Sequence, residues 1–151
     1  MERPSKPLNI SDQSSFEFVK ECLKGDPTSG INFDRIQYDF SKSQYVIIEY
    51  LLCEEVQISK NITPYSSHPN RYFLKNKMKF ISLWNFSKKI NARLYLVNYA
   101  KKGTRFENQV LLMRMINLDL ANTQPVKTKN KEMTKEEFSD WLRKLNSKGF
   151  E

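Results

Sequence analysis

Two acidic residues lie in neighbouring segments that are otherwise rich in Ile, Val, Tyr and Phe. Asp34 belongs to the run 31–40, and Glu49 lies within the run 45–53 among aliphatic and aromatic neighbours. An ionised carboxylate in such surroundings is costly, so Glu49 needs a partner, a proton or a metal. A place at the exposed end of a sheet, or pairing with Arg35 or a helix lysine, would meet this need. A divalent cation held by Asp34 and Glu49, with positions open for water and phosphate, would also meet it.

The two runs predict the strands of a β-hairpin, because a short polar stretch separates them. With a turn centred between residues 42 and 43, Asp34 would lie opposite Leu51, and Glu49 opposite Ile36. The two carboxylates would then be diagonal neighbours on one face. Backbones about 7–8 Å apart allow such side chains to close around one cation. A turn of odd length would instead place them on opposite faces.

Basic residues dominate the middle of the chain. The whole chain has 25 Lys and Arg against 17 Asp and Glu, and residues 60–106 hold 11 of these basic residues and no acid. Such a segment cannot neutralise its own charge, which favours a polyanionic partner, above all nucleic acid. The alternative is a solvated basic face that only aids solubility.

Two basic connections and one predicted helix supply the candidate contacts to nucleic acid. The connection around His68, the only histidine, has the residue types of a phosphate-binding loop. The His68 ring could instead order the loop itself, ligate a metal or transfer a proton to a leaving oxygen. Residues 98–105 predict a basic loop at a strand end, and the helix predicted over 72–90 carries two lysines one turn apart. The expected contacts are His68, Asn70, Arg71, Lys75, Lys79, Lys101, Lys102 and Arg105.

The predicted elements follow the order helix, strand, strand, helix, strand, strand, helix, which indicates an α/β fold with a mixed central sheet flanked by helices. Capping boxes at Ser14/Glu17 and Thr134/Glu137 mark the first and last helices. We expect residues 1–13 to form a flexible arm and residues 14–151 a single domain. The elements between the two terminal helices are expected at 31–40, 45–53, 72–90, 92–100 and 106–118.

This order, with Asp34 and Glu49 on the first two strands, resembles the core of the PD-(D/E)XK nuclease superfamily over roughly residues 14–100. The resemblance implies a restriction-endonuclease-like fold in which Asp34 and Glu49 bind Mg²⁺ or Mn²⁺. A carboxylate from the first helix often joins them in this family, and Glu21 matches that position.

The chain departs from the family pattern at one important position. The motif lysine is expected two residues after Glu49, and Leu51 stands there. Some members of the superfamily supply this lysine from the following helix, and Lys75 or Lys79 would do so here. Otherwise the chemistry is lost.

The sequence therefore predicts a metal-dependent endonuclease, with DNA favoured over RNA as its substrate. The alternative is a catalytically inactive nuclease-fold module that binds nucleic acid or a protein partner. Small nucleases of this kind often act as homodimers.

No apolar run has the length of a membrane span, and the two cysteines form no CxxC motif or disulfide framework. We thus expect no membrane partner and a reducing, cytoplasmic location.

Overall fold

The computed structural model describes residues 14–30 and 33–150. The chain forms two compact units, residues 1–30 and residues 31–151, and each is described by itself. The described part of the first unit contains helix α1 (Ser14–Leu23), which confirms that a helix begins the predicted order of elements. The arm predicted for residues 1–13 lies outside the described residues, and the single domain over 14–151 stays a prediction.

The second unit contains the predicted hairpin, formed by the antiparallel strands β1 (Arg35–Asp39) and β2 (Gln44–Leu52). Arg35 pairs with Ile48, so the predicted register, with Asp34 opposite Leu51, is wrong by two residues. A shift of two residues preserves the alternation of side chains, and Asp34 and Glu49 therefore stay on one face. Extended by one residue beyond Arg35, the observed register brings Asp34 opposite Glu49 itself.

The turn of this hairpin accounts for the observed register. Asp39 ends β1, and its Oδ1 accepts hydrogen bonds from the Ser41 hydroxyl and the Lys42 amide at 2.5 and 3.2 Å. These bonds hold residues 40–43 as the loop and leave Asp39 paired with Gln44. A side chain thus selects the turn, which strand propensity alone does not specify.

Five strands form one mixed sheet in the order β1-β2-β3-β4-β5. The three later strands are β3 (Arg93–Tyr99), β4 (Gln109–Leu118) and β5 (Val126–Thr134). β2 runs parallel to β3, whereas the other neighbours are antiparallel. β2 therefore lies inside the sheet, as its continuous apolar sequence predicts. The α/β class is confirmed.

The fifth strand is missing from the predicted elements because its sequence is mostly polar. Lys127, Lys129 and Lys131 of β5 are exposed, and only Val126 and Met133 are buried. β5 pairs with β4 alone, so it forms an edge of the sheet. Lysines on an edge strand oppose pairing with other chains, which explains the composition that hides the strand.

The connection between β2 and β3 contains α2 (Glu55–Ile58), two 3₁₀ turns, η1 (Pro69–Arg71) and η2 (Phe73–Asn76), and the long helix α3 (Lys77–Lys89). The prediction of one continuous helix over 72–90 is therefore wrong for residues 72–76, which precede α3. Tyr72 and Asn76 have φ angles of −134° and −123°, which interrupt the helical backbone.

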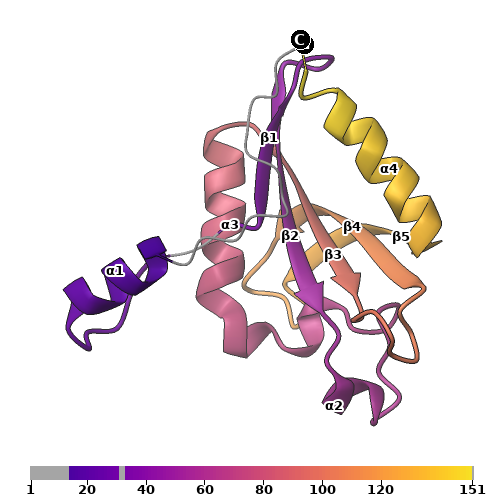
Figure 1. The fold of residues 1–151 in the computed structure, drawn as a ribbon, viewed down its shortest axis with the longest axis horizontal. Helices are drawn as coiled ribbons and strands as arrows, with labels where there is room; N and C mark the ends of the chain where they lie inside the picture. The colour runs from indigo at the N-terminus through magenta and orange to yellow at the C-terminus, as the bar shows by residue number, and fades with distance from the viewer. Residues whose placement is uncertain (1–13, 31–32, 151) are drawn as a thin grey trace. The chain divides into compact units, whose positions relative to one another are not determined.

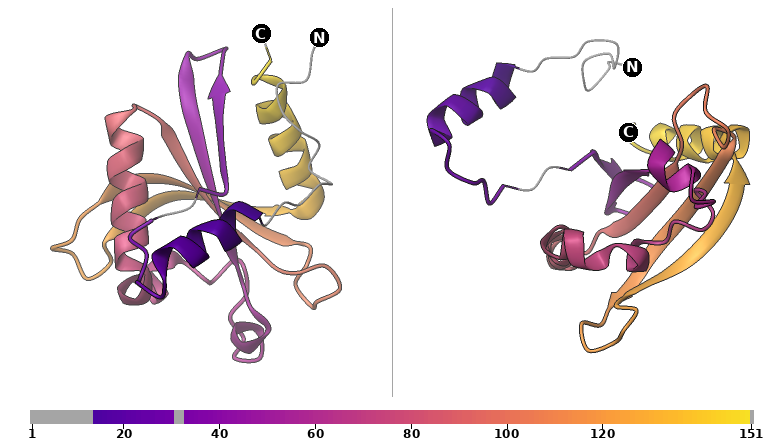
Figure 2. Two further views of the ribbon diagram at one scale, coloured as in Figure 1. Left: turned by 60° about the vertical axis from the view of Figure 1, so that its left-hand side comes forward. Right: turned by 90° about the horizontal axis from the view of Figure 1, so that it is seen from below.

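Two helices cover opposite faces of the sheet in the second unit, α3 on one face and α4 (Lys135–Ser147) on the other (Figures 1 and 2). On the α3 face, Ile47 packs in a cluster with Phe80; on the α4 face, Ile48 packs in a cluster with Leu145. The predicted capping box at the start of α4 is confirmed. Among the described residues, no helix has the length and apolar character needed to cross a membrane.

Candidate active site

Asp34 lies directly before β1 and is held by the neighbouring strand. Its Oδ2 accepts a hydrogen bond of 2.8 Å from the backbone amide of Tyr50. The side chain itself is exposed. A backbone donor thus orients one oxygen of this carboxylate, while the group remains accessible to solvent and to any ligand there.

Glu49 lies on the α3 face of β2 and is only 3% exposed. Its Oε1 is 2.6 Å from Nζ of Lys79, whereas Oε2 is buried and has no hydrogen-bond partner. Burial raises the pKa of Glu49 above its ordinary value, and the charge of Asp34 adds to this rise; Lys79 and the backbone amide of Asp34 oppose it. The two carboxylates are therefore close enough to interact, and one buried oxygen is left unsatisfied.

The ion pair distinguishes the two lysines proposed from the sequence. Lys79 lies in the first turn of α3, and its side chain is 34% exposed while it contacts Glu49. Lys75 lies in η2 and is exposed. Of the two, only Lys79 forms an ion pair within the described part of the chain.

Leu51, where the resemblance to the PD-(D/E)XK superfamily would place a lysine, occupies the hydrophobic cluster beneath α3 and is 8% exposed. Because Lys79 is long and reaches from the helix, it brings an ammonium to Glu49 while leucine fills the core at position 51. The pairing with a helix lysine is also the structural alternative that the sequence left open for Glu49.

The donors available to a cation are two carboxylates. No group of three or more His, Cys, Asp or Glu side chains suited to a metal occurs among residues 14–30 and 33–150. Glu21 lies in α1, in the other compact unit, so its position relative to Asp34 and Glu49 is not defined. Two carboxylates fit Mg²⁺ or Mn²⁺, because such ions keep several waters and bind substrate phosphates besides one or two protein oxygens. The unsatisfied Oε2 of Glu49 is an additional feature that suits a cation.

The predicted phosphate-binding residues His68 and Asn70 are used to hold the loop to β5. Nε2 of His68 lies 2.9 Å from Oγ1 of Thr128, and Nδ1 accepts a hydrogen bond from the Asn70 amide. The Asn70 side chain donates to the carbonyl of Val126 and accepts from its amide, at 2.9 and 2.8 Å. Burial lowers the pKa of His68, which favours the neutral ring. These contacts match the loop-ordering interpretation.

The remaining predicted contacts to nucleic acid, Arg71, Lys101, Lys102 and Arg105, are exposed. They occur on two separate connections, with Arg71 in η1 and the other three in the loop between β3 and β4. Arg93 belongs to the same segment but is buried and paired with Asp39. At least one of the basic residues that suggested nucleic acid therefore serves the fold.

Sequence reasoning missed two residues that organise this site. The amide of Tyr50 orients Asp34, and no sequence pattern marks a backbone donor. Asn98 of β3 is buried beside Leu51, and its Nδ2 donates to the carbonyls of Pro64 and Ser67. An asparagine within an otherwise apolar strand could have indicated such an anchor for the loop.

Comparisons with known proteins give no assignment: no protein-family model, no curated protein and no solved structure matches this chain.

Proposed function

We propose that this protein is a metal-dependent nuclease that hydrolyses phosphodiester bonds, with DNA favoured over RNA. The observation that carries the proposal is the state of Glu49, a buried carboxylate with one oxygen paired to Lys79 and the other without a partner. Leaving a buried charged group partly unsatisfied is costly, and perturbed carboxylates of this kind concentrate at functional sites.

Asp34 and Glu49 would hold Mg²⁺ or Mn²⁺. When bound, the cation polarises the scissile phosphate and lowers the pKa of a bound water. Glu49 can serve two partners, because Lys79 contacts Oε1 and leaves Oε2 for the cation. The bond from the Tyr50 amide fixes Oδ2 of Asp34 and leaves Oδ1 available.

Lys79 supplies a positive charge at the site. Its ammonium stands beside Glu49 and, being one-third exposed, can also reach the surface where a phosphate would lie. A positioned ammonium stabilises negative charge that develops in the transition state and can donate a proton. Exposed Lys and Arg side chains of residues 60–106 would hold the nucleic-acid backbone.

A second candidate is a nuclease-fold module that binds nucleic acid without cleaving it. Two observations favour it: Leu51 replaces the motif lysine, and Lys79 already compensates the charge of Glu49. In this case the ion pair serves stability, and the basic residues alone account for binding.

Cleavage assays distinguish the two candidates. Supercoiled plasmid and single-stranded RNA are incubated with the protein in Mg²⁺, Mn²⁺ or EDTA, and we expect plasmid cleavage only with a cation. Asp34→Asn and Glu49→Gln should each abolish cleavage and leave DNA binding in EDTA intact. Asparagine retains an acceptor for the Tyr50 amide, and Glu55→Gln, an exposed glutamate in α2, is the matched control. Linear product without nicked plasmid would indicate a homodimer that cuts both strands.

Thermal denaturation gives an independent readout of cation binding. Mn²⁺ should raise the melting temperature of the wild type by about 2–4 °C for each kcal/mol of binding free energy. Neither Asp34→Asn nor Glu49→Gln should show this rise. Salt-dependent DNA binding without cleavage, and without a shift in Mn²⁺, would contradict the nuclease and support the binding module.

A further inference from the structure

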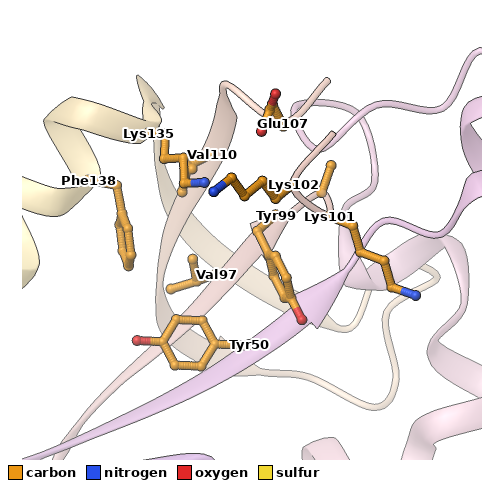
Figure 3. A pocket seen from close by; sticks show the side chains of 10 residues that line it. Tyr50, Val97, Tyr99, Lys101, Lys102, Glu107, Val110, Lys135 and Phe138 are labelled. Carbon is orange, nitrogen blue, oxygen red and sulfur yellow. The ribbon is translucent and has the colours of Figure 1, made fainter. Parts of the chain in front are cut away.

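A pocket of about 420 Å³ lies on the α4 face of the sheet, at the ends of β2 and β3 (Figure 3). Its apolar walls come from three strands and from α4. Consecutive residues of a strand point to opposite faces, so Tyr50 lines this pocket while Glu49 lies on the α3 face. The pocket is therefore distinct from the candidate active site. The hydrophobic residues that line it are Tyr50, Val97, Tyr99, Ala100, Val110 and Phe138.

Three aromatic rings shape the interior. Tyr50 makes edge-to-face contacts with Tyr99 and Phe138, at centroid distances of 6.3 and 6.4 Å. In Figure 3, Phe138 and Tyr99 lie on either side of Val97, with Tyr50 below them. A planar ring placed over Val97 would meet aromatic groups on its sides, and a volume in the range of 300–1,000 Å³ is typical of small-molecule sites.

The rim is positively charged. Lys101, Lys102 and Lys135 border the pocket together with a single acid, Glu107. Figure 3 shows the side chains of Lys102 and Lys135 pointing toward one another, whereas Lys101 points away. Within the described part of the chain, none of these lysines forms an ion pair.

Glu107 does not cancel this charge at the interior. Its Oε2 accepts a hydrogen bond of 3.1 Å from the Gly103 amide, which holds the carboxylate to its own loop. A purely apolar ligand would leave the rim lysines without a partner, and a simple anion would leave the aromatic walls uncovered. The pocket thus suits a molecule that combines a flat ring with a strong negative charge.

We propose that this pocket binds a nucleotide, with the base among Tyr50, Tyr99 and Phe138 and the phosphate at Lys102 and Lys135. Aromatic rings accept any base by stacking, and ammonium groups bind phosphate through charge-assisted hydrogen bonds. The nucleotide comes either from solution or from an unstacked position of a nucleic-acid strand. The proposal goes beyond the nuclease, because it requires no cation and no cleavage.

Isothermal titration calorimetry in EDTA tests the pocket directly. UMP and AMP are titrated at millimolar concentration, with uridine, adenosine and inorganic phosphate as partial ligands. We expect saturable binding of at least one nucleotide, tighter than that of its nucleoside and of phosphate. The double variant Lys102→Ala/Lys135→Ala should weaken binding about tenfold or more, because charged hydrogen bonds are lost. Lys144→Ala, an exposed lysine in the last turn of α4, is the matched control and should change nothing.

A second variant tests the aromatic wall without opening the core. Phe138→Leu keeps an apolar side chain and should weaken nucleotide binding about tenfold through lost stacking. Thermal denaturation verifies that each variant is folded. Absence of saturable binding by both nucleotides would overturn the proposal, as would equal binding by the wild type and the double lysine variant.

Competition identifies the source of the nucleotide. A fluorescent 5′-phosphorylated hexathymidylate is bound to the protein in EDTA, and UMP is added. Displacement by UMP, together with weaker oligonucleotide binding in Phe138→Leu, would assign the pocket to a nucleotide of a strand. Nucleotide binding that the oligonucleotide does not compete with would assign it to a free nucleotide.

Discussion

Two buried carboxylates of the sheet, Asp39 and Glu49, each form an ion pair with one basic side chain. They differ in the contacts of the oxygen that remains. Asp39 is 0% exposed; Oδ2 pairs with Arg93, and Oδ1 accepts from Ser41 and Lys42. Glu49 is 3% exposed; Oε1 pairs with Lys79, and Oε2 has no hydrogen-bond partner.

The two pKa values shift in opposite directions for this reason. Hydrogen bonding by Ser41, opposed by burial and assisted by Arg93, lowers the pKa of Asp39. Burial dominates at Glu49 and raises its pKa. The surroundings of Asp39 therefore stabilise its ionised form. Through its contacts, Asp39 links the hairpin turn to Arg93 at the start of β3. Glu49 keeps one buried oxygen without a hydrogen-bond partner, and its raised pKa distinguishes it from Asp39.

The largest expected effect concerns Asp39. Asp39→Asn should lower the free energy of unfolding by about 3–5 kcal/mol, because it leaves the buried guanidinium of Arg93 without a counter-charge. Glu49→Gln should cost about 1 kcal/mol or less, since Lys79 can be solvated. Urea denaturation measures both values, and Asp140→Asn, an exposed site in α4, should change stability by no more than about 0.5 kcal/mol. Equal losses at Asp39 and Glu49 would remove the distinction between the two pairs.

The next largest effect concerns the lysine side chains near Glu49 and assumes that the protein is the proposed nuclease. Lys79→Met should reduce the cleavage rate by about 100-fold with DNA binding nearly unchanged, because a positioned charge is lost. Lys75→Met is the matched control and should affect binding rather than rate. Single-turnover cleavage and filter binding separate these outcomes. Similar, modest rate losses in both variants would argue that Lys79 serves only the ion pair.

The smallest effect is the pH dependence of stability. The folded pKa of Asp39 is lowered, so its stabilisation is present above the ordinary value of 3.8 and is lost as pH falls through the folded pKa. The folded pKa of Glu49 is raised, so its ionisation costs stability as pH rises from the ordinary value of 4.5 through the folded pKa. Relative to Glu49→Gln, the wild type should therefore gain stability as pH falls from 7 toward 4.5. Urea titrations across this range measure the difference, and a constant difference would contradict the shift at Glu49.

Several elements could be predicted because their signals are local. The last helix carries its own capping box, and α4 begins directly after the predicted N-cap residue Thr134. β2 has apolar residues at both odd and even positions, and it lies inside the sheet. The expectation that Glu49 needs a partner also rests on neighbouring residues alone, because a single acid in an apolar strand is costly to bury without one.

Other features depended on contacts between distant segments. The sequence could not choose between Lys75 and Lys79, because the interruption at Asn76 separates their backbones. It could not recognise β5, whose polar residues become a strand only by pairing with β4. It also counted Arg93 among the basic residues available to nucleic acid, although Arg93 is buried and pairs with Asp39, 54 positions earlier.

The sequence by itself determined the α/β class, the apolar strand around Glu49, the last helix and the excess of basic residues between 60 and 106. Each of these features follows from the types and spacing of residues that are close in the sequence, so hydrophobic periodicity and charge patterns reveal it. Only the tertiary structure decided the hairpin register, the partner of Glu49 and the pocket beside Tyr50. These depend on which backbones lie side by side, and a turn held by one carboxylate or a break in one helix changes that arrangement without changing the local pattern.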